Sequence, residues 1–221
     1  MWEEYYAVLR HLPDWLKKPV PFVAESVSFF RESGAESILD LGCGVGRNSI
    51  YLGKNGFNVI GVDISRHALK KTKARAKIED VPSVTVLCCS MTNLPFVRQT
   101  FHAIISVSVV HHAVKKDIQR TVNEIRKILK RDGIFLTNLL STTDCRYGSG
   151  EEVEEGSFRF LEKFEVKEFE EVHHFFSKKE ILKLLEGFGC ISVELIKSGA
   201  EKPHEYWKVV AIRAEAKKAR A

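Results

Sequence analysis

Long hydrophobic runs are absent from this sequence of 221 residues, and no apolar stretch reaches the length that crosses a bilayer. The N-terminus opens with Met1-Trp2-Glu3-Glu4, which places acidic residues where a secretion signal carries basic ones. No CxxC pair occurs among the five cysteines, an odd number that argues against a disulfide framework or a zinc site. We therefore expect a cytoplasmic protein that has no membrane partner.

A uniform excess of one charge is also absent. The net charge is +5, but residues 145–172 hold nine Glu against four Lys and Arg, a local net of −5 that leaves +10 for the rest of the chain. A basic body with an acidic insert differs from the continuous basic face of a nucleic-acid-binding protein. A nucleic-acid partner therefore stays open but is less favoured.

Strand-like apolar segments alternate with helical patterns along most of the chain. The expected strands are residues 37–41, 57–62, 84–87, 103–107, 134–140, 191–196 and 207–212. The expected helices are residues 46–55, 65–79 and 115–130, followed by a helix that begins at the capping residue Ser177. This alternation predicts an α/β fold, a doubly wound and mostly parallel sheet with helices on both faces. No helix separates the last two strands, so we expect them to be antiparallel.

The length and the continuous pattern predict a single domain over residues 1–221. Residues 1–33 are expected to form a helical cap, because aromatic and leucine side chains recur near the N-terminus at helical spacing. Packing on the domain is the simpler interpretation of these aromatics, and a flap that closes over a ligand is the alternative. Residues 142–175 are expected to form an acidic, lid-like insert.

The most informative motif is Asp40-Leu-Gly-Cys-Gly-Val-Gly-Arg-Asn48, which follows a strand and opens a helix. Open α/β sheets bind ligands at this end of their strands, where glycines let the backbone approach a ligand closely. Dinucleotide binding requires G-x-G-x-x-G, but Arg47 stands at the third glycine position and the spacing here is G-x-G-x-G. Asp40 can fix the loop or meet the cationic end of a ligand. Asp63, about twenty residues on, can accept hydrogen bonds from both ribose hydroxyls, whereas Ser65 is available to cap the next helix.

Together with Asn93–Phe96, Ser106–His112 and Asn123–Gly133, these motifs resemble the class I S-adenosylmethionine-dependent methyltransferases over nearly the whole chain. The resemblance implies a seven-stranded sheet whose last strand is antiparallel, with S-adenosylmethionine as the cofactor. It also implies cofactor contacts at Gly42, Gly44, Asp63, Ile64, Met91 and Ser106. Ser90 stands where the family often has an acid that reads the adenine, although a serine can still accept a hydrogen bond.

Within this class, the sequence is most similar to the small-molecule branch that includes the tellurite-resistance-type methyltransferases. The stretches that carry this similarity are Gly44–Ser49, Tyr147–Glu152 and His173–Ser177. The branch implies methyl transfer to an oxygen, nitrogen or sulfur atom of a small-molecule acceptor. The glutamates of the insert would repel phosphate-rich acceptors and tolerate cationic ones, or they are simply solvated.

Methyl transfer from a sulfonium needs an aligned nucleophile, and it needs a base only where the nucleophile carries a proton. The candidate catalytic residues are His111, His112 and His174, because histidine changes charge near neutral pH. The first two follow the fourth expected strand, and His173 and His174 lie at the end of the insert. We expect no metal site from these two pairs, because adjacent residues point in different directions on regular structure.

Two other functions stay open. An RNA (tRNA) methyltransferase would use the basic body of the chain, including the segment from Arg66 to Lys77, which is rich in Lys and Arg. A non-catalytic scaffold would retain the fold alone, although the glycine loop and Asp63 argue against it. The sequence gives neither the identity of the methyl acceptor nor the oligomeric state.

Overall fold

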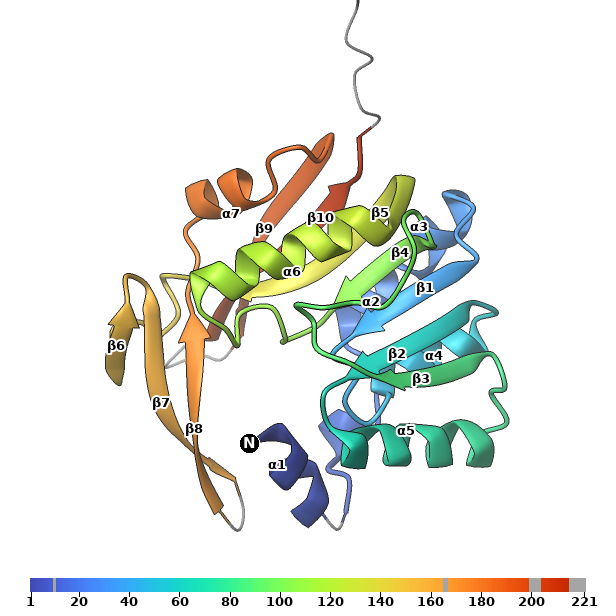
Figure 1. Ribbon diagram of the computed structural model, residues 1–221, viewed down its shortest axis with the longest axis horizontal. Helices are drawn as coiled ribbons and strands as arrows, with labels where there is room; N and C mark the ends of the chain where they lie inside the picture. Colours follow the sequence, from blue (N-terminus) through green and yellow to red (C-terminus); the bar gives the residue numbers. More distant parts are fainter. Residues whose placement is uncertain (10, 165–166, 199–203, 215–221) are drawn as a thin grey trace, which may run out of the picture.

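The computed structural model describes residues 1–9, 11–164, 167–198 and 204–214 (Figure 1). Its centre is a seven-stranded sheet with the order β3-β2-β1-β4-β5-β10-β9. The strands are β1 (Ser37–Leu41), β2 (Asn58–Asp63), β3 (Val84–Cys88), β4 (Phe101–Ser106), β5 (Leu129–Leu140), β6 (Glu151–Glu154), β7 (Ser157–Phe164), β8 (Lys167–His174), β9 (Cys190–Ser198) and β10 (His204–Ile212). Within the large sheet, only β10 runs antiparallel to its described neighbours, β5 and β9. This arrangement confirms the predicted fold class.

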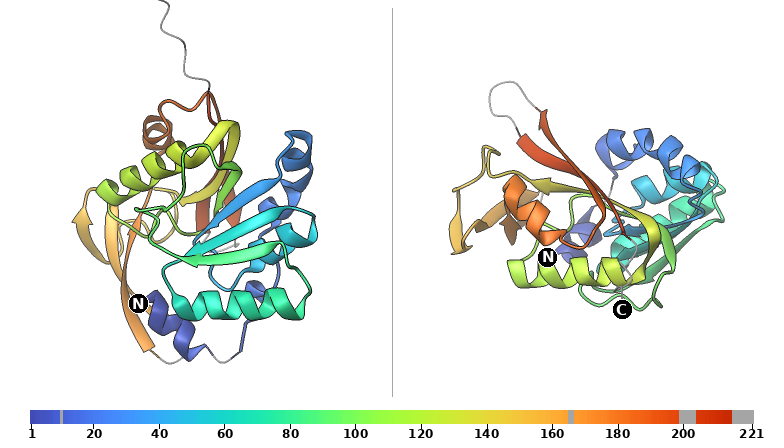
Figure 2. Two further views of the ribbon diagram at one scale, coloured as in Figure 1. Left: turned by 45° about the vertical axis from the view of Figure 1, so that its right-hand side comes forward. Right: turned by 90° about the horizontal axis from the view of Figure 1, so that it is seen from above.

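Helices cover both faces of the large sheet (Figure 2). They are α1 (Trp2–Val8), η1 (Asp14–Leu16), α2 (Pro21–Glu25), α3 (Val27–Glu32), α4 (Arg47–Lys54), α5 (Arg66–Ile78), α6 (Lys115–Ile128) and α7 (Lys178–Leu184). The helices α2, α3 and α4 pack their apolar side chains on one face, and α6 and α7 pack on the other. In the part of the chain that is described, no helix is long and apolar enough to cross a membrane.

Two helices begin at the capping residues that the sequence predicted. The Ser65 hydroxyl accepts the backbone N–H of Ala68 at the start of α5, and the Ser177 hydroxyl accepts that of Glu180 at the start of α7. Each cap of this kind stabilises a protein by about 1 kcal/mol. The cap at Ser65 also fixes the direction in which the chain leaves β2, and Asp63 lies at that point.

Strand β5 is longer than the strand expected at residues 134–140. It begins at Leu129, directly after α6, and its pairing with β4 shifts register between Phe101 and Ala103. Asp132 lies inside this stretch with a φ of +57°. The stretch between the expected helix and the expected strand is therefore a bulge within a strand, because Leu129 already pairs with Phe101 of β4.

Two segments flank the carboxyl ends of the central strands. Residues 1–33 hold α1, η1, α2 and α3, and the insert forms a second sheet of three antiparallel strands, β6-β7-β8. Phe169 of β8 packs in one hydrophobic cluster with Tyr5, Tyr6 and Leu9 of the N-terminal segment. The N-terminal end of β8 consequently lies beside α1, as the lower part of Figure 1 shows.

Candidate active site

The glycine loop between β1 and α4 bends through three glycines with left-handed backbone angles. The φ angles of Gly42, Gly44 and Gly46 are +72°, +55° and +80°. A Cβ atom on Gly42 would lie 2.1 Å from Cγ2 of Val109, and one on Gly44 would lie 2.6 Å from the hydroxyl oxygen of Tyr6. Glycine is therefore required at position 42 by backbone conformation and by space, and at position 44 by backbone conformation.

A cavity of about 310 Å³, called here the glycine-loop cavity, opens in front of this loop. It lies at the carboxyl ends of β1, β2 and β4, where open α/β sheets bind their ligands. The sequence-predicted residues that line it are Gly42, Gly44, Asp63, Ile64, Ser90, Met91 and His112. Its volume is in the range of pockets that hold small molecules.

Asp63 ends β2 with its carboxylate fixed in place by the backbone. Its Oδ2 accepts the N–H of Gly44 at 2.9 Å, and its Oδ1 accepts the N–H of Ser65 at 2.8 Å. Burial raises the pKa of Asp63, and the backbone N–H groups partly oppose this rise. Each carboxylate oxygen keeps a further lone pair. The side chain is therefore a prearranged hydrogen-bond acceptor at the wall of the cavity.

Asp40 lies beneath the glycine loop, outside the lining of the cavity. Its side chain is buried, and its Oδ2 accepts a hydrogen bond of 2.5 Å from the Ser49 hydroxyl. Burial raises the pKa of Asp40 to about 6, although the bond from Ser49 and the charge of Arg47 oppose the rise. This placement favours the first of the two roles considered for Asp40, that of fixing the loop.

The remaining predicted cofactor contacts differ in their placement. Ile64, which is largely exposed, and Met91 both line the cavity. Ser90 lines it too, with its hydroxyl oxygen 2.9 Å from that of Thr92. Ser106 is fully buried at the end of β4, outside the cavity lining, and its hydroxyl has no hydrogen-bond partner among the described residues.

The N-terminal segment forms a roof over the glycine-loop cavity, to which it contributes Trp2, Tyr6, Trp15 and Leu16. Glu3 on α1 accepts hydrogen bonds from the Ser65 hydroxyl at 2.7 Å and from the backbone N–H of His67 at 3.1 Å. These contacts join α1 to the start of α5. The sequence favoured simple packing for these aromatics, and the structure shows that they also face the cavity. Helical spacing alone could not distinguish the two roles.

A second cavity of about 400 Å³ adjoins the first. Arg47, Ser108 and His112 line both cavities, so the two meet near the residues that follow β4. Other residues that line the second cavity are His111, Asn138, Asp144, Arg146, His173 and His204. No described glutamate of the insert lines either cavity. Glu171 is the insert glutamate that comes near, because its carboxylate contacts His112 and His173, which line the second cavity.

The structure gathers three of the four paired histidines and separates the fourth. The ring centroid of His112 lies 4.4 Å from that of His111 and 4.6 Å from that of His173. Burial lowers the pKa of His111 well below its usual value, which keeps the ring neutral. His174 points away, because it hydrogen-bonds Ser157 and Glu180 outside the lining of both cavities.

Glu171 contacts two of these histidines, although no role for it was predicted from the sequence. Its Oε1 lies 2.9 Å from Nδ1 of His112, and its Oε2 lies 3.2 Å from Nε2 of His173. Burial raises the pKa of Glu171, but the two histidines lower it to about 2, so the carboxylate is ionised at neutral pH. The alternation of side chains along β8, which puts residues 171 and 173 on one face, was the signal available.

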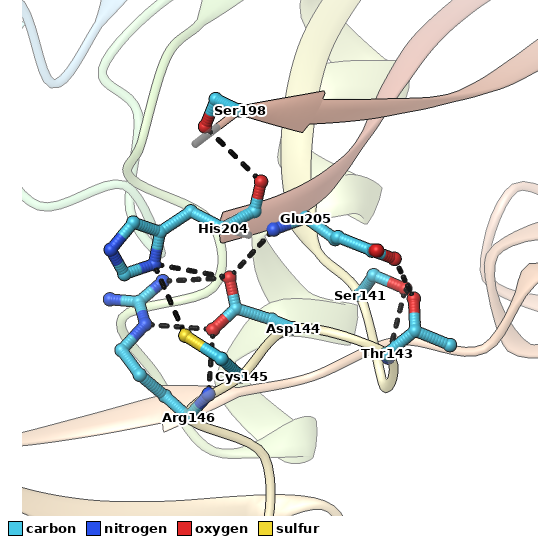
Figure 3. A network of polar contacts seen from close by, with 8 residues as sticks. All are labelled: Ser141, Thr143, Asp144, Cys145, Arg146, Ser198, His204 and Glu205. Atoms are coloured by element: carbon cyan, nitrogen blue, oxygen red, sulfur yellow. Dashed lines mark hydrogen bonds and ion pairs between the residues drawn. The ribbon is translucent and has the colours of Figure 1, made fainter. Parts of the chain in front are cut away.

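A polar network forms one wall of the second cavity (Figure 3). The Asp144 carboxylate accepts the Nε–H of Arg146 at 2.8 Å and the backbone N–H of Glu205 at 2.9 Å, and Nδ1 of His204 lies 3.6 Å away. These contacts join the start of the insert to β10. They also hold the Arg146 guanidinium at the edge of the cavity.

Comparisons with known proteins agree with this arrangement. Residues 38–133 match the methyltransferase domain family. The chain is 32% identical over 122 residues to a Geobacillus protein named as a methyltransferase, which covers 55% of this chain and 49% of that protein. An S-adenosylmethionine-dependent methyltransferase of Methanosarcina mazei has a TM-score of 0.73 at 19% identity, over 90% of this chain and 100% of that chain. The 1,6-didemethyltoxoflavin-N1-methyltransferase of Burkholderia thailandensis has a TM-score of 0.64 at 16% identity, over 87% of this chain and 79% of that chain.

The chain spans about half the length of the curated relatives it matches, with 49% and 46% for two of them. The segment that matches the domain family runs from β1 into β5, so it contains the glycine loop, Asp63 and the histidine pair after β4. The sheet order and the solved structures agree on the fold. Residues 38–133 therefore match a methyltransferase domain, and the large sheet has the same fold as solved S-adenosylmethionine-dependent methyltransferases.

Proposed function

We propose that this protein transfers a methyl group from S-adenosylmethionine to a small-molecule acceptor, as its resemblance to the tellurite-resistance-type branch implies. The observation that carries the proposal is the meeting of two cavities at Arg47, Ser108 and His112. A donor in the glycine-loop cavity and an acceptor in the second cavity would bring their reacting atoms together at this junction. Holding two reactants in line is the main requirement of a methyl transfer.

The glycine-loop cavity suits the cofactor. Gly42 and Gly44 leave space that a Cβ atom would fill, and Asp63 offers a fixed carboxylate for the ribose hydroxyls. Ser90 and Met91 line the same cavity and would contact the adenine. When bound, the cofactor supplies a methyl group on a sulfonium, whose departing thioether is a good leaving group.

The chain itself would exclude water and activate the acceptor. Trp2 and Trp15 of the roof cover the cavity, and a closed site strengthens the electrostatic interactions inside it. His112 stands at the junction, with Glu171 against one of its ring nitrogens and His173 beside it. These groups are placed to act on a nucleophile that carries a proton.

The lining of the second cavity favours a neutral or anionic acceptor. Arg146 and Asp144 line it as an ion pair of 2.8 Å, so Arg47 is the charged lining residue outside that pair. A thiol, a hydroxyl or a carboxylate fits these surroundings better than the cationic acceptor that the acidic insert would tolerate. A volume of about 400 Å³ also suits a small molecule.

The proposal is tested by incubating the purified protein and tritiated S-adenosylmethionine with small-molecule, RNA and protein fractions of an extract of the source organism. Label should enter the small-molecule fraction. Asp63→Asn should bind S-adenosylhomocysteine roughly 10- to 100-fold more weakly, because a hydrogen bond to a charged group contributes about 1.5–3 kcal/mol. Asp14→Asn is the matched control, since its carboxylate is exposed and outside both cavities.

The other outcomes are equally decisive. Label in RNA would refute the small-molecule acceptor and support a tRNA methyltransferase. A wild-type protein that does not bind S-adenosylhomocysteine would refute the enzyme and support a scaffold that retains only the fold.

A further inference from the structure

His112, Glu171 and His173 form a cluster beside the junction of the two cavities, in which Glu171 and His173 are buried. One ring nitrogen of each histidine and one carboxylate oxygen all lie within 4.8 Å of one another. Glu171 and His173 project from the same face of β8, and His112 reaches them from the loop after β4. The sequence predicted no metal site, because the two histidines of a pair diverge. The fold instead joins one histidine from each pair to a carboxylate.

One polar atom of this cluster is buried without a partner. Nδ1 of His112 and Oε1 of Glu171 lie 2.9 Å apart and face each other, whereas Nδ1 of His173 has no hydrogen-bond partner among the described residues. Glu171 is 6% exposed and His173 is 3% exposed, so solvent has little access to them. Buried polar atoms nearly always have a partner in native proteins. A ligand placed among these atoms would supply one.

The charge of the cluster suits a cation. The Glu171 carboxylate places its two oxygens against a ring nitrogen of His112 and one of His173, so an acidic group lies between two imidazoles. Ionised carboxylates and neutral imidazoles are the forms that bind metal ions.

We propose that His112, Glu171 and His173 bind a divalent transition-metal ion such as Zn²⁺. Two histidines and one glutamate form the protein ligand set of catalytic zinc sites, which keep a further position for water or substrate. His112 and His173 both line the second cavity, so that position would face the acceptor. The binding of the metal stands on the cluster alone, whereas its role in methyl transfer rests on the proposed function.

In that role the metal would bind the thiol or hydroxyl of the acceptor and lower its pKa, and the proton would leave to solvent. The resulting anion would attack the methyl carbon from the side of the second cavity. The new bond forms to carbon as the carbon–sulfur bond of the sulfonium breaks, and the electron pair of the broken bond stays on sulfur. The metal thereby makes a separate general base unnecessary.

A second group of ligand-type side chains, Asp144, Cys145 and His204, provides the comparison. Its ligand atoms also lie within 4.8 Å of one another. However, Cys145 and His204 are exposed, and the Asp144 carboxylate already accepts hydrogen bonds from Arg146 and from the backbone of Glu205 (Figure 3). This group therefore needs no ion to satisfy it.

The proposal is tested by titrating the metal-free full-length protein with Co²⁺ and following the visible absorbance, with Zn²⁺ as the competitor. A single Co²⁺ should bind without a thiolate charge-transfer band in the near ultraviolet. Glu171→Gln and His173→Gln should each weaken binding by at least roughly 100-fold, because the loss of a ligand costs more than the loss of a ligand's hydrogen-bond partner, which costs about 10- to 100-fold. Cys145→Ala should bind Co²⁺ like the wild type.

Each variant is also titrated with S-adenosylhomocysteine, whose affinity should not change because Glu171 and His173 lie outside the lining of the glycine-loop cavity. That result shows that the variants are folded. A wild type that does not bind Co²⁺, or binding that is lost in Cys145→Ala, would overturn the metal site. Binding of Co²⁺ without binding of S-adenosylhomocysteine would support the metal site and refute the methyltransferase.

Discussion

Replacing Gly42 with alanine tests how closely the glycine loop approaches its surroundings. The new Cβ would lie 2.1 Å and 2.7 Å from the two methyl carbons of Val109, a residue that lines the glycine-loop cavity. The left-handed backbone at φ +72° adds strain of about 1–2 kcal/mol for any other residue, and overpacking adds about 1–3 kcal/mol. Gly42→Ala should therefore lose about 2–5 kcal/mol of unfolding free energy, the sum of these two costs. If Val109 moves into the cavity, the affinity for S-adenosylhomocysteine should fall roughly tenfold, or about 1.4 kcal/mol.

Gly56→Ala is the matched control, because Gly56 has a φ of +92° and a Cβ there meets no atom within 4 Å. This variant should lose only the unfolding free energy that corresponds to backbone strain, about 1–2 kcal/mol, and its affinity for S-adenosylhomocysteine should not change. Adding Val109→Ala to the Gly42→Ala variant should restore the part of the unfolding free energy that overpacking removes. Urea denaturation gives the stabilities, and calorimetric titration gives the affinities. Equal losses in the two glycine variants, or no recovery with Val109→Ala, would refute the steric reasoning.

Two further substitutions test the supports of the site. Burial raises the pKa of Asp40 from 3.8 to about 6, so the native state binds more protons than the unfolded state between these values. As the pH rises from about 4 to 6, the unfolding free energy of the wild type should fall by up to about 3 kcal/mol relative to that of Asp40→Asn. A difference in unfolding free energy that stays constant with pH in urea denaturation would contradict this. Glu3→Gln removes the negative charge at the start of α5, so amide exchange in α1 and dissociation of S-adenosylhomocysteine should both quicken. Unchanged exchange in α1 would show that Glu3 does not hold the roof.

The glycine loop and Asp63 could be located from the sequence because their signals are local. The spacing of the glycines, the strand before them and the acid about twenty residues on all lie within one short stretch. The helix caps at Ser65 and Ser177 are local too, and both are confirmed. The start of β5 was missed because the bulge at Asp132 resembles a turn in sequence and is recognisable only from the pairing with β4.

The histidine cluster depended on contacts that no local pattern reports. His112 and Glu171 are 59 positions apart, and they meet only because the insert folds back on the end of the large sheet. His174 was selected because it neighbours His173, but alternation along β8 sends adjacent side chains to opposite faces. His174, which was predicted to be catalytic, and its neighbour His173 therefore have different surroundings.

The contacts of the roof of the glycine-loop cavity determine when during synthesis this part of the protein can fold. Tyr5 and Phe169 pack in one cluster although they are 164 positions apart in the chain. On the ribosome, α1 emerges long before β8, and contacts of such separation form late because loop closure must precede them. The nascent chain can complete its central sheet only after β10 is released, and α1 has no β8 to pack against until more than 160 residues after it have been made. The capacity to retain a cofactor is thus acquired only after β8 and β10 have been synthesised.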